Sequence, residues 1–270
     1  MIDNLLSTPF FLNALLMSIL LGLLFGLLSF FIVIRKMAFL GAGIAHIAFG
    51  GIALGLLLDI HPMISALVFC MAAALLIGRL IRTGYVNYDT GIGILFSFSM
   101  ALGVLLISIR KDYTFDLAGY LFGNILGVTR LDILLTAIVA VVFIPFILLF
   151  MQKLLYISFD EPAARVTGVP VDLLDTFMLV SLAVIIVASI RMVGIILVSA
   201  LTVLPASFGN LFSRQYRGVL AGSLIFSLST LAGGLLLAYQ VDLPAGSTIV
   251  VLGTLIYLFS LGMIQFKKHP

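Results

Sequence analysis

The sequence predicts an all-α fold: a polytopic bundle of eight to nine membrane-spanning helices, formed by one transmembrane domain over residues 1–270. Composition is the first reason, because 63% of the residues are hydrophobic and only 9% are charged, whereas soluble domains carry about a quarter charged residues. The second is that nearly uncharged runs, each long enough to cross roughly 30 Å of hydrocarbon, recur from end to end. These runs are apolar all round, so helices rather than barrel strands satisfy the backbone within the membrane.

The expected spans follow one another with short breaks. The first begins after Asp3 without a preceding basic segment and is long for a signal peptide, so we expect it to be retained. Turns at His61 and Asp242, each with a proline close behind, precede the third and ninth spans. Arg191 barely separates the sixth span from the seventh, which leaves a count of eight open. In order, the nine spans are residues 10–34, 38–59, 63–80, 89–109, 131–152, 171–190, 192–212, 218–238 and 245–265.

Basic residues predict the orientation in the cell membrane, because cytoplasmic loops are enriched in Lys and Arg. With the N-terminus outside and the C-terminus in the cytoplasm, ten of the fourteen basic residues fall on the cytoplasmic side. They lie in short pairs between spans and form no basic soluble face, so we expect membrane lipid and no nucleic acid as a partner. The four basic residues on the outside would be Arg110, Lys111, Arg130 and Arg191.

The connection at residues 110–132 is too apolar for a plain loop. Glycine recurs at every fourth position, at Gly119, Gly123 and Gly127, which gives one helical face a flat strip suited to close packing. We expect a short re-entrant helix that enters the membrane from the outside, since irregular backbone is tolerated there only beside protein or a water-filled cavity.

The connection at residues 154–170 reads LLYISFDEPAARVTGVP and predicts a short helix at about 158–169. Acids at Asp160 and Glu161 precede a proline, which is the order typical of a helix start. Gly168 is placed to end the helix. A capped surface connector and a docking helix, whose small alanines let a cytoplasmic partner approach, explain this pattern equally well.

His46 is the only histidine within a predicted span. Many small residues surround it in the sequence, which indicates a helix packed inside the bundle. Ionisable groups at that depth tend to mark a pathway, and imidazole is the commonest protein ligand for transition metals. A hydrogen bond from the ring to a neighbouring carbonyl would also explain the residue. Ala42 and Gly50 stand one turn away on either side, so no permanently bound metal is expected.

Asp89 begins the fourth span and is most simply an N-cap, an acceptor for free backbone donors at the helix start. A place in the pathway or its gate is the alternative. No catalytic residue is predicted. The sequence lacks any Gly-Lys dipeptide, which excludes a Walker A loop, and a single cysteine, Cys70, excludes a disulfide within the chain. If nucleotide energises this protein, the ATPase is another chain.

Several segments together resemble the zinc- and manganese-type permeases of ABC transporters, the ABC-3 family. These segments are IRKMAFLGAGIAH at residues 34–46, DTGIG at 89–93, YLFGNIL at 120–126, residues 160–168, VGIILVSALTVLPA at 193–206 and LPAG at 243–246. They occur in the family's order and cover nearly the whole chain.

The resemblance implies the type II ABC importer fold, with two permease copies, two cytoplasmic ATPases that bind ATP and an external solute-binding protein. It implies a transport subunit and not an enzyme. The cargo would be a divalent zinc, manganese or ferrous ion moving past His46 and Asp89. Relatives often carry aspartate at the position of Ala42, and some carry histidine at that of Ser97, so the ion stays open. The coupling helix would offer the ATPase Asp160, Glu161, Ala163, Ala164 and Gly168.

Two other functions are weighed against this one. An ABC permease for a metal chelate, such as a siderophore, haem or cobalamin, usually has more spans and a longer chain. A self-sufficient ion-coupled carrier normally keeps several acids within the membrane, whereas the acids here lie almost entirely at span ends.

Overall fold

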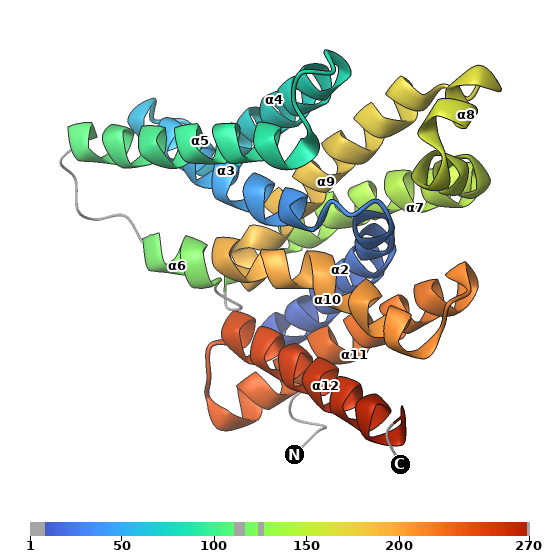
Figure 1. Cartoon of the computed structure of the whole chain (residues 1–270). Coiled ribbons are helices and arrows are strands. Elements are labelled where there is room, and N and C mark those ends of the chain that lie inside the picture. The colour runs from blue at the N-terminus through green and yellow to red at the C-terminus, as the bar shows by residue number, and fades with distance from the viewer. Residues whose placement is uncertain (1–8, 111–116, 124–126, 269–270) are drawn as a thin grey trace.

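The computed structural model describes residues 9–110, 117–123 and 127–268, and every regular element within these ranges is a helix. Eight of the helices are long and apolar enough to cross a membrane, so the all-α polytopic prediction is confirmed (Figure 1). The helices are α2 (Pro9–Ile34), α3 (Ala38–Leu57), α4 (Pro62–Arg82), α5 (Tyr88–Arg110), α6 (Leu117–Phe122), α7 (Arg130–Phe159), α8 (Glu161–Val166), α9 (Val171–Val193), α10 (Ile195–Phe212), α11 (Tyr216–Val241) and α12 (Ala245–Lys268).

The two short helices mark opposite ends of the bundle, called here the α6 end and the α8 end (Figure 1). At the α8 end, one polar pocket is lined by the last turn of α4 and the first turns of α5, α8 and α9. At the α6 end, one apolar pocket is lined by the start of α2, the residue after α6, the end of α11 and the start of α12. Consecutive long helices therefore run in opposite directions between these ends.

The α9–α10 boundary differs from the predicted one. Arg191 does not break the chain, because it lies in the last turn of α9; the break is at Gly194, with φ 88° and ψ 156°. Only glycine adopts this backbone conformation readily. The 18 residues of α10 are about 27 Å long at 1.5 Å per residue, which makes α10 a short ninth apolar helix.

Pro205 interrupts the hydrogen-bond ladder of α10, as proline does inside a helix. The N–H of Ala206, the next residue, donates to the hydroxyl of Ser29 in α2, at 3.0 Å. One side chain from a neighbouring helix thus satisfies a buried donor beside the proline, and this bond attaches α10 to α2.

The helices α2, α3 and α9 lie inside the bundle. These three helices are largely buried, whereas α5, α7 and α12 expose most of their length. In α3, a Cβ added to Gly43 would lie 2.0 Å from a methyl carbon of Ile92, in α5. The prediction that the glycine-rich second span is an interior helix is therefore confirmed.

Candidate functional site

His46 lies near the middle of α3, on the least buried stripe of that helix, with Phe39, Ala42 and Phe49. Ring nitrogen Nδ1 is 2.8 Å from the carbonyl oxygen of Ala42. A carbonyl can only accept, so Nδ1 carries the proton and the lone pair of the neutral ring is on Nε2. The predicted hydrogen bond to a neighbouring carbonyl is therefore present. It also leaves the ring in the form that binds a metal through Nε2.

An aromatic side chain of α5 holds the ring from a second direction. The centroids of His46 and Phe96 are 5.2 Å apart, with the rings at 77°, and Phe96 also meets Phe39 edge-on. The two helices approach closely nearby, since a Cβ on Gly50 would lie 2.8 Å from the carbonyl oxygen of Ser99. A backbone carbonyl and an aromatic edge thus fix the orientation of the imidazole.

Asp89 is not the cap of α5. The cap is Asn87, whose Oδ1 accepts from the N–H of Thr90 at 2.9 Å, so the N-cap role predicted for Asp89 is wrong. Asp89 is exposed in the first turn of α5, where the helix dipole favours a carboxylate. Phe96, beside His46, follows it by seven residues, about 10 Å of helix. Asp89 and His46 therefore lie at different depths of the bundle.

Metal ligands are sparse in this one chain. Within the described ranges, no three His, Cys, Asp or Glu side chains lie close enough together to hold a metal ion. Ala42 contributes only its carbonyl to the imidazole, and Ser97 is exposed on α5.

At the other site, α8 is a short capped helix between α7 and α9. Asp160 caps the end of α7 and the start of α8. Its N–H donates to the carbonyl of Tyr156 in α7, and its Oδ1 accepts from the N–H of Ala163 in α8 at 3.0 Å. Gly168 has φ 80°, in the left-handed region that favours glycine. The predicted start at Asp160 and stop at Gly168 are confirmed. The helix is shorter than 158–169, because α7 continues to Phe159.

The exposed side of α8 is not its alanine side. Ala164 is fully buried against the bundle and Ala163 is half-buried. The apolar side chains that face away are Phe159 and Val166, which are 77% and 89% exposed. Sequence reasoning missed both, because a helix of six residues has no repeating pattern that separates its exposed side from its buried side.

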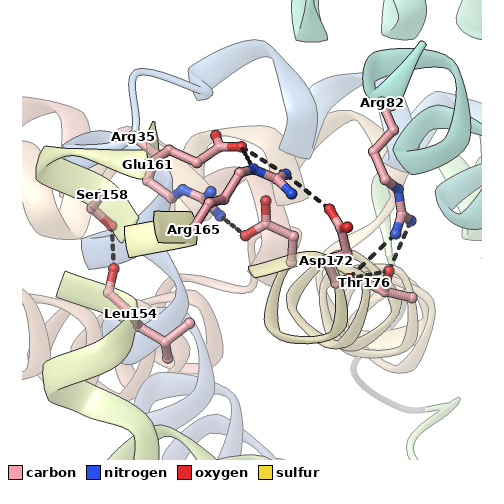
Figure 2. Close-up of polar contacts among 9 residues, drawn as sticks. Arg35, Arg82, Leu154, Ser158, Glu161, Arg165, Asp172 and Thr176 are labelled. Carbon is pink, nitrogen blue, oxygen red and sulfur yellow. Dashed lines mark hydrogen bonds and ion pairs between the residues drawn. The ribbon is translucent and has the colours of Figure 1, made fainter. Parts of the chain in front are cut away.

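Ion pairs attach α8 to the first turn of α9 (Figure 2). Arg165 contacts Glu161 in its own helix at 2.9 Å and Asp172 of α9 at 2.8 Å. Hydrogen bonds from its guanidinium to Asp172 and Glu161 raise the pKa of Arg165. From the other side, Arg82 at the end of α4 donates to the hydroxyl of Thr176 in α9 at 2.9 Å. The start of α9 is therefore held from two sides.

A more buried ion pair joins Arg35, at the α2–α3 corner, to Asp175 of α9. The atoms Nη1 and Oδ1 are 2.8 Å apart, and the side chains are 9% and 13% exposed. Burial acts to lower the pKa of Arg35, and the Asp175 carboxylate more than offsets this, so the pKa is raised. Oδ1 has no aligned hydrogen bond, which makes the contact an ion pair. Sequence reasoning gave neither residue a role beyond topology.

At the α6 end, three glycines let three chain segments meet backbone to backbone. A Cβ on Gly194 would lie 2.5 Å from the amide nitrogen of Gly123, and one on Gly246 would lie 2.4 Å from the carbonyl oxygen of Val193. Nearby, Arg191 of α9 pairs with Asp132 of α7 at 2.7 Å. In the predicted re-entrant segment, α6 is the described helix. Residues 111–116, with Lys111, and 124–126 lie outside the described residues.

These features define a class: an integral membrane protein of packed, antiparallel helices, with a histidine midway along an interior helix and a short capped helix projecting at one end. Comparison with known proteins indicates the same class. The chain is 33% identical to the manganese transport system membrane protein MntC of Listeria monocytogenes, over 99% of this chain and 98% of that protein. It is also 33% identical to the manganese import system permease protein ScaB of Streptococcus gordonii, over 99% and 96%.

A solved structure, PsaBC from Streptococcus pneumoniae in complex with Fab, matches with a TM-score of 0.83 and 34% identity, covering 96% of this chain and 93% of that one. The family model of the ABC 3 transport family matches residues 7–264. The chain therefore belongs to the ABC 3 transport family, and it is a membrane permease, a transport subunit. The resemblance drawn from its sequence segments is confirmed.

Proposed function

We propose that this chain is the membrane permease of an ATP-driven importer for a divalent transition metal, with manganese as the first candidate. The observation that carries the proposal is His46, whose Nδ1 is engaged with the Ala42 carbonyl at 2.8 Å, so that Nε2 is free to accept a metal ion in passing. The manganese systems named for two relatives support the choice of ion. Zinc and ferrous iron suit the same imidazole.

We propose that a second copy of the chain supplies a further ligand to the path. We assign the contact between copies to the stripe of α3 that carries His46 and to the exposed face of α5. That face carries polar Thr90 and Ser97 next to apolar Ile94 and Phe98, and hydroxyls are less costly against another helix than against lipid. In such a homodimer, two imidazoles would face one path.

The motor is assigned to a separate cytoplasmic ATPase that docks at the α8 end. Asp160, Glu161 and Gly168 shape the docking helix, and Phe159 and Val166 supply its exposed apolar surface. Ala163 and Ala164 support this helix from the bundle side. The chain lacks a Walker A loop, so ATP is bound by the partner.

The orientation follows from this assignment. The α8 end lies in the cytoplasm of a cell whose plasma membrane holds the chain. The N-terminus is then outside, the C-terminus is in the cytoplasm, and the α6 end faces an external solute-binding protein. The basic residues support it, because the larger share falls at the α8 end.

The docking assignment is tested by Val166→Asp, with Ile60→Asp at the α6 end as the matched control. Val166 is 89% exposed and Ile60 48% exposed, so neither change buries a charge. We expect V166D to lose copurification with the ATPase and I60D to keep it. Equal copurification of both variants would contradict docking at α8.

The two alternatives are separable by cargo and energy source. A chelate permease would take up an iron–siderophore, haem or cobalamin and ignore the free ion. A self-sufficient carrier would move metal without ATP. We find no observation that favours either one.

A further inference from the structure

We propose that Arg35 and Asp175 are positioning residues that couple the docking helix α8 to α3, the helix that carries His46. The inference deepens the proposed function and rests on it. It assigns a role in transmitting movement from the ATPase to the transport path.

The first step is the connection between α8 and α9. α8 packs mainly against α7 and α9, and Arg165 joins it to Asp172 at 2.8 Å. Asp172 and Asp175 are three residues apart, so they are neighbours on one face of α9. A displacement of α8 by a docked partner therefore acts on the turn of α9 that carries Asp175.

The second step is the corner between α2 and α3. The N–H of Lys36 donates to the carbonyl of Val33 and the N–H of Met37 to that of Ile32, while Lys36 has φ 56°. This is a Schellman motif, which holds the corner in one conformation. Because α3 starts at Ala38, a force on the Arg35 side chain is passed directly to the start of α3.

The third step is the Arg35–Asp175 ion pair, which joins the α2–α3 corner to α9. Its side chains are almost fully buried, so separating them would leave a charge without a partner in a poorly solvated place. The pair therefore moves as one unit. The Arg165 pairs, by contrast, are about half exposed, so water screens them more than it screens the buried pair.

The space around the network leaves room for α8 and α9 to move together. A pocket of about 340 Å³ lies between α4, α5, α8 and α9 and is lined by Arg82, Tyr88, Glu161, Arg165, Asp172 and Asp175. α8 thus has room to shift relative to α4 and α5, while the buried pair keeps α9 attached to the α2–α3 corner.

The test uses the complete importer, with its ATPase and binding protein, in proteoliposomes supplied with Mn²⁺ and ATP. The variants are Arg35→Ala, Asp175→Asn and the charge-swapped double variant Arg35→Asp/Asp175→Arg. The matched control is Arg191→Ala, which breaks the Arg191–Asp132 pair at the opposite end of α9. Uptake and ATP hydrolysis are measured in the same vesicles.

We expect R35A and D175N to bind the ATPase and hydrolyse ATP as before, with uptake per ATP about 10-fold lower. The charge swap restores part of this ratio, and R191A leaves it unchanged. If R35A or D175N fails to assemble with the ATPase, the inference is judged on uptake per ATP in the charge-swapped variant, because that variant keeps both charges.

Uptake and hydrolysis that fall in proportion, or an equal loss of the ratio in R191A, would overturn the inference and leave the proposed function standing. A wild-type importer without ATP-dependent Mn²⁺ uptake would instead overturn the proposed function, and this inference with it.

Discussion

At the scale of single residues, the protein uses backbone carbonyls to set side-chain chemistry inside the membrane. His46 donates from Nδ1 to Ala42, which fixes the tautomer without a second ionisable group. A carboxylate at residue 42 would add charge at that depth, where charge is expensive. Ala42 adds no charge there, which fits the transient contact with a cation that we propose for His46.

The tautomer of His46 predicts which of two substitutions, H46Q or H46N, keeps more transport activity. The amide of glutamine reaches about as far as Nε2, and that of asparagine about as far as Nδ1. We therefore expect H46Q to keep more Mn²⁺ uptake than H46N, with H46N reduced about 10-fold or more, as for a disturbed metal ligand. Radioactive Mn²⁺ uptake by cells measures this, with ATPase copurification as the control for folding. Greater activity in H46N would indicate that Nδ1 faces the ion.

Gly194 has a backbone conformation that a residue with a side chain adopts only with strain. We expect Gly194→Ala to destabilise the protein by roughly 2 kcal/mol or more, from the strained φ and ψ, and Cβ would also overlap the carbonyl oxygen of Leu121 at 2.5 Å. Gly262→Ala is the matched control, since no atom lies within 4 Å of its added Cβ. Thermal unfolding in detergent, followed by gel filtration, compares the two. Equal melting temperatures would show that the junction can relax.

At the scale of elements, α9 is the helix on which both ends of the bundle depend. Its first turns hold α8, α4 and the α2–α3 corner through Asp172, Thr176 and Asp175. Its last turn holds α7 through Arg191, and its C-terminus meets α6 at Gly194. A helix held in this way moves as a rigid body, so we expect conformational change to be concentrated at its termini.

The exposed face of α5 carries a prediction about assembly. In a Cys70→Ser background, Ser97→Cys should crosslink two copies, because disulfides form only when the Cα atoms come within about 7 Å and Ser97 is exposed on the proposed contact face. Leu149→Cys on α7, at a position 79% exposed, serves as the control and should stay monomeric. Oxidative crosslinking in native membranes, read on a denaturing gel, distinguishes them. Crosslinking through residue 149 alone would place the interface on α7.

At the scale of the whole molecule, much of the fold was predictable because the membrane demands it. Every long helix overlaps a predicted span, since apolar length and basic flanks carry that signal locally. The end of α7 was misplaced, because Lys153 does not stop the helix: its ammonium lies 5.6 Å from the Phe150 ring centroid and α7 continues to Phe159. The cap of α5 was assigned to Asp89 instead of Asn87, because both residue types suit a cap and they are only two positions apart.

The sites were less predictable, because they depend on contacts distant in sequence. Arg35 and Asp175 are 140 positions apart, and no local pattern pairs them. Nor does sequence reveal that Ala164 faces the bundle while Val166 faces away, since both follow Pro162 in a helix of six residues. His46 was identified because one ionisable residue among glycines and alanines is conspicuous in any span.

On the proposed function, this chain moves a divalent metal only when a separate ATPase drives it. The most direct measurement is Mn²⁺ uptake into proteoliposomes that hold the chain alone or with its ATPase, with the binding protein on the α6 side. We expect ATP-dependent uptake with the ATPase and none by the chain alone. Uptake by the chain alone, without ATP, would contradict it.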